Sequence, residues 1–190
     1  HNLNYYTMTA SQGKPGLEKK LVNSYLMADG SRFTDIKGYE TMQFFAEVQN
    51  RDPRLSQTIR TPGYKRLGEN NTLVQEFGAT MTGYQLIKFV AAPKWDTYNK
   101  DITDMPIFRY AEVLLNYAEA KAEKGTLTQA DLDMSTKLTR DRVGMPNINM
   151  AQANANPDPY QANMYKNLSG DNKGVLLEIR RERRIELVME

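Results

Sequence analysis

The sequence contains no cysteine and only one histidine, His1, among its 190 residues. Without cysteine, the chain can form neither a disulfide framework nor a zinc site with thiolate ligands. With a single histidine it has no Ser–His–Asp triad, no histidine zinc cluster and no histidine general base within the chain. No pair of carboxylates stands out as an acid and a base. The residue types therefore indicate no catalytic centre, no metal site and no cofactor.

The chain also lacks an excess of one charge and a long apolar run. Lysine and arginine number 25 and aspartate and glutamate 23, which gives a net charge of +2. Surfaces that bind nucleic acid usually carry a marked positive excess, so we expect no nucleic-acid partner. No window approaches the roughly 18 consecutive apolar residues of a membrane-spanning helix. The apolar fraction of 40% and the charged fraction of 25% are ordinary for a globular domain.

Glycine and proline divide the sequence into two parts. Residues 1–103 are interrupted too often for long periodic elements, so we expect loops with a short helix within 38–50 and a short strand at 84–90. Residues 104–190 carry apolar side chains at the spacings of three and four that are typical of helices. The expected fold is mainly α, with long irregular loops and one short β-element in a single domain.

Two of the expected helices form a hairpin. The first spans 105–124, since an aspartate N-cap precedes it and a proline lies in its first turn. The second spans 128–143, since Thr128 begins a capping box and a glycine and a proline follow its end. The short connection between them predicts antiparallel packing, with Leu114 and Ala118 buried between the helices.

A third helix is predicted from about residue 175 to the end, after a surface segment rich in asparagine and proline at 145–174. Glutamates recur on this helix every four residues, and like charges at this spacing repel one another on an exposed helix. Two interpretations of this glutamate stripe stay open. The glutamates are either paired with arginines of the hairpin, or they form a solvated face of the helix. Pairing predicts that at least one of these arginines contacts Glu182 or Glu186. The stripe consists of Glu178, Glu182, Glu186 and Glu190, and the candidate arginines are Arg109, Arg140 and Arg142.

Five stretches follow one another at characteristic distances. Residues 21–30 read LVNSYLMADG, and residues 50–55 read NRDPRL. Residues 105–120 read MPIFRYAEVLLNYAEA, which is the most specific of the five. Residues 140–146 read RDRVGMP, and residues 177–187 read LEIRRERRIEL. Each stretch alone is a weak signal, but their order and spacing over nearly the whole chain resemble the SusD/RagB family of nutrient-binding lipoproteins.

The resemblance implies a SusD-like helical fold related to tetratricopeptide repeats, of which this chain is the middle to near C-terminal part. It implies binding without catalysis, by a cell-surface protein of the outer membrane that captures oligosaccharides and passes them to a SusC-type TonB-dependent transporter. Contact with the membrane would be made only through an N-terminal lipid anchor that lies outside this sequence.

RagB-like members of the family suggest an alternative, in which the chain is a peptide-binding or scaffolding subunit of such a transporter. A glycan site would show two or more accessible aromatic rings beside asparagine, aspartate or arginine. A peptide site would show a deep groove with unpaired backbone groups. A cytosolic tetratricopeptide adaptor is a third interpretation, which would require further repeats.

Family members stack sugar rings on aromatic side chains of loops, because the C–H face of a sugar packs well on an apolar ring. In this chain the loop before residue 105 carries the single tryptophan, whose other possible role is to anchor the loop on the core. Neighbouring amide and carboxylate groups would bond to sugar hydroxyls. The candidate ligand-binding residues are Trp95, Asp96, Tyr98, Asn99 and Tyr64.

The ends of the sequence lead to one further expectation. The chain starts with His1, and its last predicted helix has no stop signal, as expected for a piece of a longer protein. Apolar side chains near the end would then lack their cover. We therefore expect Leu187 and Val188 to be exposed or to lie in an intermolecular contact.

Overall fold

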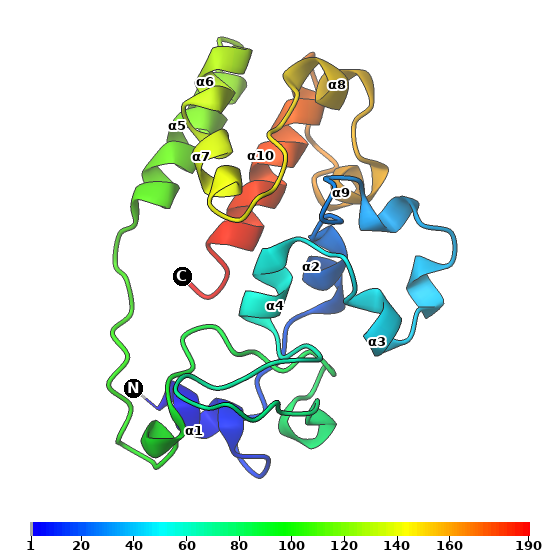
Figure 1. Cartoon of the computed structure of the whole chain (residues 1–190). Coiled ribbons are helices and arrows are strands. Elements are labelled where there is room, and N and C mark those ends of the chain that lie inside the picture. Colours follow the sequence, from blue (N-terminus) through cyan, green and yellow to red (C-terminus); the bar gives the residue numbers. More distant parts are fainter. Residues whose placement is uncertain (1) are drawn as a thin grey trace.

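The computed structural model describes residues 2–190, and within them the fold is helical (Figure 1). The predicted strand at 84–90 is not formed, because Gln85 and Leu86 make only isolated β-bridges. The chain then turns, with Phe89 in the left-handed region at φ 66°. The β pairings in the described chain are Gly16 with Gln85, Met27 with Arg51, Ile59 with Leu86 and Lys65 with Thr72.

Helix α10, at Lys173–Glu186, is the central element of the molecule. Figure 1 shows the hairpin helices on one side of it and two short helices on the other. The hairpin consists of α5 (Tyr110–Glu123), α6 (Gln129–Asp133) and α7 (Thr136–Asp141), and the short helices are α8 (Met150–Ala155) and α9 (Pro159–Met164).

The first hundred residues form the loop-rich part below these helices in Figure 1. Its helices are short, and the predicted helix within 38–50 is reduced to a single turn at α3. The α-helices here are α1 (Leu3–Met8), α2 (Lys19–Ser24), α3 (Phe44–Glu47) and α4 (Pro53–Thr58). The 3-10 helices are η1 (Phe33–Asp35), η2 (Tyr39–Thr41), η3 (Phe77–Ala79) and η4 (Pro93–Trp95).

Helix α10 takes part in two hydrophobic cores, which joins the two parts of the chain. Its first half packs with the hairpin and α8 through Val175, Leu176 and Ile179. Its last turn and the residues that follow pack with the loop-rich part through Ile185 and Val188. The partners in the second core come from residues 17–86 and include the fully buried Tyr25 and Ile59.

The predicted hairpin is present, with Leu114 and Ala118 buried. In Figure 1, α5 runs upward, and α6 and α7 return beside it. The capping box at Thr128 is formed with Asp131 as predicted. The hairpin therefore follows the sequence pattern in its position and in its buried face.

Two details of the hairpin were predicted wrongly. Helix α5 begins at Tyr110 instead of residue 105, and Arg109 before it is extended, with its guanidinium bound to Glu186 and Glu190 of α10 and the residues after it. The residue before a proline avoids helical backbone, which also disfavours a start at Met105. The second helix is broken in two at Ser135, whose hydroxyl donates to the carbonyl of Asp131. Hydroxyl side chains inside a helix compete in this way for backbone carbonyls.

The segment 145–174 is not the surface excursion that its composition suggests, because its two helices pack on α10. The start of α10 is held by the Val175 N–H, which donates to the Asn154 side chain at 2.8 Å. Gly174 lies against the backbone of α8, where an added Cβ would be 1.9 Å from the carbonyl oxygen of Ala153. Only glycine permits this approach between the two helices.

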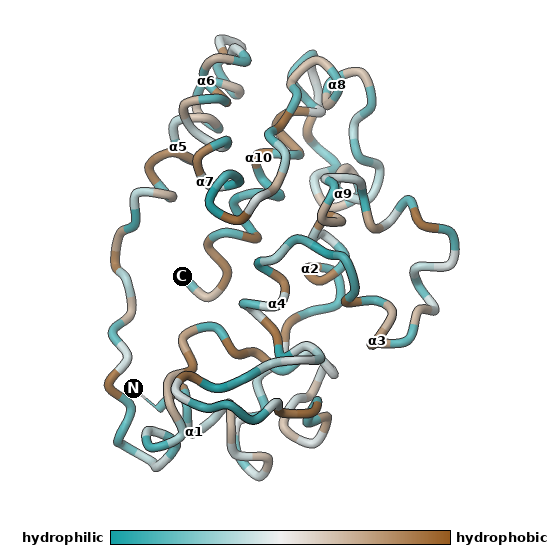
Figure 2. The backbone as a smooth tube through the Cα atoms, in the orientation of Figure 1, coloured by the Kyte–Doolittle hydropathy of each residue, from teal (hydrophilic) through white to brown (hydrophobic). Residues whose placement is uncertain are grey.

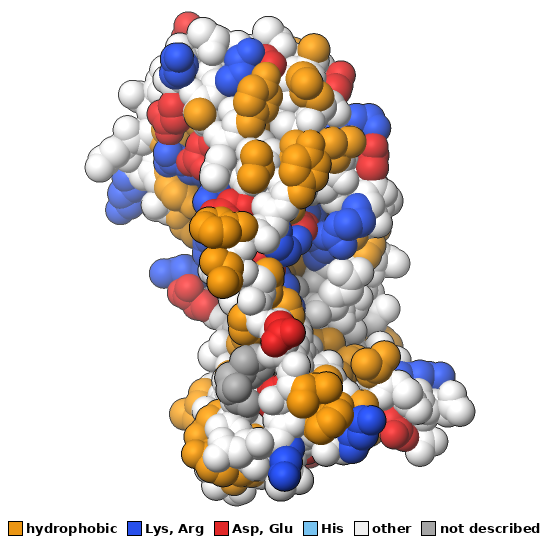
Figure 3. All heavy atoms as spheres, turned by 90° about the vertical axis from the view of Figure 1, so that its left-hand side faces the viewer, with side chains coloured by type: hydrophobic (Ala, Val, Ile, Leu, Met, Phe, Trp, Pro, Cys, Tyr) orange, Lys and Arg blue, Asp and Glu red, His pale blue; other side chains and the backbone are white. Residues whose placement is uncertain are grey.

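The expectation for the end of the chain was also wrong. Val188 is buried in the chain's own core, where Ile59 and other residues of the loop-rich part cover it, and Leu187 is half-buried. Exposed apolar side chains lie instead on the segment that leads into α5, where Ile107 and Phe108 are 85% and 86% exposed. Figure 2 shows this extended segment along one edge, and Figure 3 shows hydrophobic side chains gathered on the same side. No helix within residues 2–190 is both long and apolar enough to cross a membrane.

Candidate functional site

The five candidate ligand residues do not meet at one place. Tyr98 and Asn99 lie against the first residues of the chain, whereas Asp96 lies beside Arg66. Arg66 is buried and donates to both carboxylate oxygens of Asp96, at 2.7 and 2.9 Å. Tyr64 is half-buried near the same arginine, and its burial raises the pKa of the phenol. Asp96 is therefore a structural partner of Arg66.

Trp95 ends the 3-10 helix η4 and is half-buried. The ammonium group of Lys94 lies 5.0 Å from the centre of the indole ring, within the range of a cation–π contact. The indole is thus partly covered by the protein and partly exposed. Its position agrees with either role given above, anchoring the loop on the core or stacking on a sugar.

An exposed aromatic cluster, which we call the tyrosine cluster, is formed by Tyr5, Tyr6 and Tyr98. The Tyr5 ring lies 5.4 Å from each of the other two, in edge-to-face geometry. Tyr6 and Tyr98 are 40% and 52% exposed, so their rings are accessible. Asn2 and Asn99 border the cluster, and the Asn2 amide donates to Asn99 Oδ1 at 3.0 Å. Aromatic rings and amides thus share one exposed surface.

The oxygen-rich run around Asp101 is occupied by bonds within the protein. The Asp101 carboxylate accepts the backbone N–H groups of Asn4 and Thr103 at 3.0 and 2.9 Å. Within the part of the chain that the structure describes, no group of three His, Cys, Asp or Glu residues is arranged to hold a metal ion.

The glutamate stripe of α10 is paired with arginines. Arg109 contacts Glu186 at 3.0 Å and Glu190 at 2.6 Å. Arg140 contacts Glu182 at 2.8 Å, and Arg142 contacts Glu186 at 2.8 Å. All three arginines named from the sequence therefore lie at ion-pair distance from the stripe, and the solvated-face interpretation does not hold.

A fourth arginine, Arg54, is the centre of this network and was missed in the sequence. It is buried between Glu182 and Glu186 of α10, and it also binds Asp52, the N-cap of α4, at 2.7 Å. Glu182 further accepts a hydrogen bond from Thr139 at 2.9 Å. The network joins the loop-rich part, the hairpin and α10, so its main effect is on the fold.

The charge state of Glu182 leads to a pH prediction. Burial alone would raise the pKa of this carboxyl, but Arg140 and Arg54 outweigh burial and lower the pKa from 4.5 to about 2. A carboxyl with a lowered pKa in the folded state contributes stability above its unfolded pKa and loses it as the pH falls. We expect the free energy of unfolding to fall by about 2 kcal/mol between pH 5 and pH 3 from this group alone. Urea denaturation across this range measures the slope, and in Glu182→Gln the slope should be smaller.

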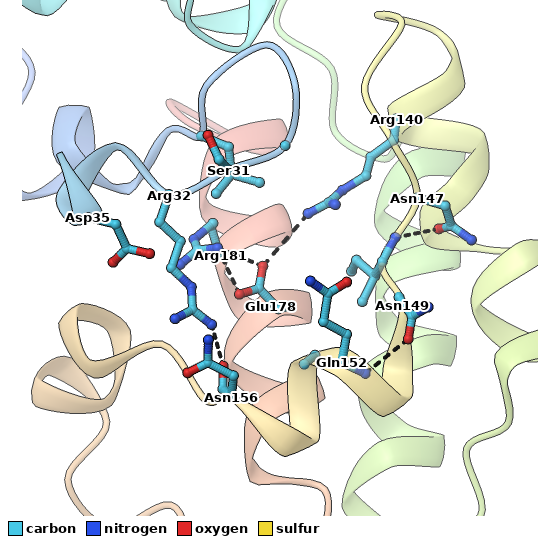
Figure 4. Close-up of a pocket in the computed structure, with 14 residues that line it drawn as sticks. Ser31, Arg32, Asp35, Arg140, Asn147, Asn149, Gln152, Asn156, Glu178 and Arg181 are labelled. Atoms are coloured by element: carbon cyan, nitrogen blue, oxygen red, sulfur yellow. Dashed lines mark hydrogen bonds and ion pairs between the residues drawn. The ribbon is translucent and has the colours of Figure 1, made fainter.

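A polar cavity of about 260 Å³ lies between α8, α10 and the loop at residues 26–35 (Figure 4). Figure 4 shows Arg140 reaching toward Glu178 from one side and Gln152 pointing into the space from α8. None of the five candidate ligand residues lines it. The lining includes Ser31, Arg32, Asp35, Arg140, Asn147, Asn149, Gln152, Asn156, Glu178 and Arg181.

Comparison with known proteins connects this geometry to a family. The sequence pattern of the SusD family matches residues 4–190 of the chain. The chain belongs to the SusD family. Comparison with curated proteins found no match.

Two solved structures that are similar to this SusD-family chain come from longer proteins. It is similar to a SusD-like carbohydrate binding protein from Bacteroides fragilis NCTC 9343, with 26% identity and a TM-score of 0.61 over 93% of this chain and 36% of that one. A second SusD-like protein from the same strain shares the fold, with 23% identity and a TM-score of 0.63 over 92% of this chain and 34% of that one. The chain spans about a third of the length of either protein.

The five stretches that resemble the family supply residues that stabilise the fold. The stretches 50–55, 140–146 and 177–187 supply Arg54, Arg140, Arg142, Glu182 and Glu186 of the network, and 105–120 supplies Arg109 and most of α5. The tyrosine cluster lies outside all five stretches. Its members Tyr5 and Tyr6 had no signal in the sequence beyond being aromatic, since no periodicity connects them to Tyr98.

Proposed function

We propose that this chain is part of a cell-surface protein that binds oligosaccharides and that the tyrosine cluster is its sugar-binding surface. The observation that carries the proposal is the combination of accessible rings at Tyr6 and Tyr98 with the side-chain amide of Asn99, which is held in place by two hydrogen bonds with Asn2. The C–H face of a sugar ring packs on an aromatic ring, and amides bond to its hydroxyl groups. The name of the B. fragilis carbohydrate binding protein supports the same ligand class.

The biological setting is part of the same proposal. As a member of its family, the whole protein would be held at the outer membrane by a lipid anchor and would deliver its ligand to a SusC-type TonB-dependent transporter. It would bind and release the sugar without chemistry. The alternative is a RagB-like peptide-binding or scaffolding subunit of such a transporter, and the experiment below distinguishes the two ligands.

Replacing Tyr98 with alanine should weaken oligosaccharide binding by roughly two- to tenfold, because a lost ring contact costs roughly 0.5–1.5 kcal/mol and 1.4 kcal/mol is a factor of ten. A glycan array selects the oligosaccharide, and isothermal titration calorimetry gives the dissociation constants. Phe45→Ala is the matched control, since Phe45 is 67% exposed on α3, outside the cluster.

If Tyr98→Ala and the unmodified protein bind the oligosaccharide with equal affinity, the tyrosine cluster is not part of the binding site. Binding of extended peptides, with no oligosaccharide bound on the array, would favour the RagB-like alternative.

A further inference from the structure

A second cavity, of about 190 Å³, lies between α4, the end of α7 and the end of α10. More cations than carboxylates line it, and three of its four cations are arginines, so we call it the arginine cavity. The charged residues of its lining are Arg54, Lys88, Arg109, Arg142, Glu186 and Glu190.

The ion pairs behind this lining leave one positive charge in excess within residues 2–190. Arg54 is also bound by Asp52 and Glu182, and Glu182 also binds Arg140. The cations of this network are Arg54, Lys88, Arg109, Arg140 and Arg142, and its carboxylates are Asp52, Glu182, Glu186 and Glu190. The neighbouring ion pairs are balanced, since Arg32 and Arg181 face Asp158 and Glu178. One monovalent anion in the arginine cavity would therefore neutralise the network.

Two side chains of the lining have accessible donors that are not in use. Arg142 has 51% of its side chain exposed, and its Nη2 donates to both oxygens of Glu186, at 3.0 and 2.8 Å. Its Nε and Nη1 make no hydrogen bond to the described residues. Gln57 is exposed on α4, and its side-chain amide has no hydrogen-bond partner in the same part of the chain. Guanidinium and amide N–H groups are the donors that a carboxylate accepts.

The uncharged part of the lining includes two apolar side chains, Phe89 and Ile185. The backbone of Phe89 lies in the left-handed region at φ 66°, which bulky residues rarely adopt. Backbone strain of this kind is concentrated at ligand-binding and catalytic sites. The volume of about 190 Å³ lies below the roughly 300–1,000 Å³ of pockets for drug-sized ligands, so the arginine cavity fits a small molecule.

We propose that the arginine cavity binds a small carboxylate that carries an apolar group. The carboxylate accepts hydrogen bonds from Arg142 and the Gln57 amide and balances the excess positive charge, while the apolar group packs on Phe89 and Ile185. Inorganic phosphate offers no apolar surface and fits this lining less well. No residue of the tyrosine cluster lines the arginine cavity, so the proposal does not depend on oligosaccharide binding.

Titration followed by saturation-transfer difference NMR tests the proposal with benzoate and with benzamide, its neutral analogue of nearly the same shape. Benzoate should bind, and benzamide should bind roughly tenfold more weakly, because hydrogen bonds to a charged acceptor are the stronger ones. Arg142→Ala should weaken benzoate binding by a similar factor. The matched control is Arg183→Ala, which removes the same charge from α10 at a residue that pairs with Glu112 and does not line the cavity. This control should bind benzoate as the unmodified protein does.

Gln57→Ala provides a second variant should Arg142→Ala disturb folding, since the Gln57 side chain makes no hydrogen bond that the fold would lose. It should weaken benzoate binding by roughly two- to tenfold, the effect of one hydrogen bond. The proposal is wrong if benzoate does not bind or if benzamide binds as tightly as benzoate. It is also wrong if both Arg142→Ala and Gln57→Ala keep the affinity of the unmodified protein. An equal loss in Arg183→Ala and Arg142→Ala would overturn it too, because the attraction would then come from net charge and not from the cavity.

Discussion

The variant Arg54→Met is expected to unfold more easily than the unmodified protein by roughly 3–5 kcal/mol, because removing one partner leaves buried carboxylates unpaired. Asp52 and Glu182 are both almost fully buried and both bind Arg54. Arg140 and Thr139 remain on Glu182 in the variant, whereas Asp52 loses its only ion-pair partner among the described residues. Guanidinium chloride denaturation followed by circular dichroism measures the loss.

Arg142→Ala is the matched control for Arg54. It removes an arginine that also binds the stripe, at Glu186, but Arg142 is 51% exposed. Exposed ion pairs contribute about 0–1 kcal/mol, so the control should lose less than about 1 kcal/mol. Equal losses in the two variants would show that burial does not set the strength of the network.

Gly174→Ala is expected to destabilise the protein by about 3 kcal/mol, the upper end of the usual range for overpacking. The added methyl group would lie 1.9 Å from the Ala153 carbonyl oxygen, so α8 must move away from α10. Alanine is a better helix former than glycine by about 1 kcal/mol, which offsets part of the cost. The measurement is the free energy of unfolding in urea.

A second-site variant separates this clash from a general effect on α10. Ala153→Gly removes a side chain next to Gly174 but leaves the clashing oxygen, which belongs to the backbone. It should therefore not restore the stability of Gly174→Ala. Rescue by Ala153→Gly would show that side-chain volume, and not the approach of the two backbones, determines the choice of glycine.

The features that could be predicted from the sequence are those set by local spacing. The apolar face of α5 predicts Leu114 and Ala118 inside, and the four-residue repeat of glutamates on α10 left pairing with arginines of the hairpin as one of two interpretations, which the structure bears out. The features that were missed arise where a side chain competes with the backbone or where distant residues meet. The Ser135 hydroxyl bonds to a carbonyl four residues earlier and breaks the second helix, and Arg109, just before α5, binds Glu186, which lies 77 positions away.

The candidate site could be predicted only in part for the same reason. Tyr98 and Asn99 were selected as loop residues near the tryptophan, but their partners Tyr5 and Asn2 are more than 90 residues away in sequence. Asp96 was selected for its carboxylate, which is instead used by Arg66. A pattern read along the chain does not show which loop side chains are already occupied by tertiary contacts.

The bond between Arg54 and Glu182 joins residues 128 positions apart. This contact forms only after Glu182 has been synthesised, and ribosomes add roughly 5–20 residues per second. The loop-rich part therefore emerges on the order of 10 s before the helix that completes its core, with Tyr25 and Ile59 uncovered during that time. Long-range closure of this kind also slows folding, since the entropy of a large loop is lost before its contacts form. Residues of the loop-rich part are thus exposed to proteolysis and aggregation until α10 has been synthesised.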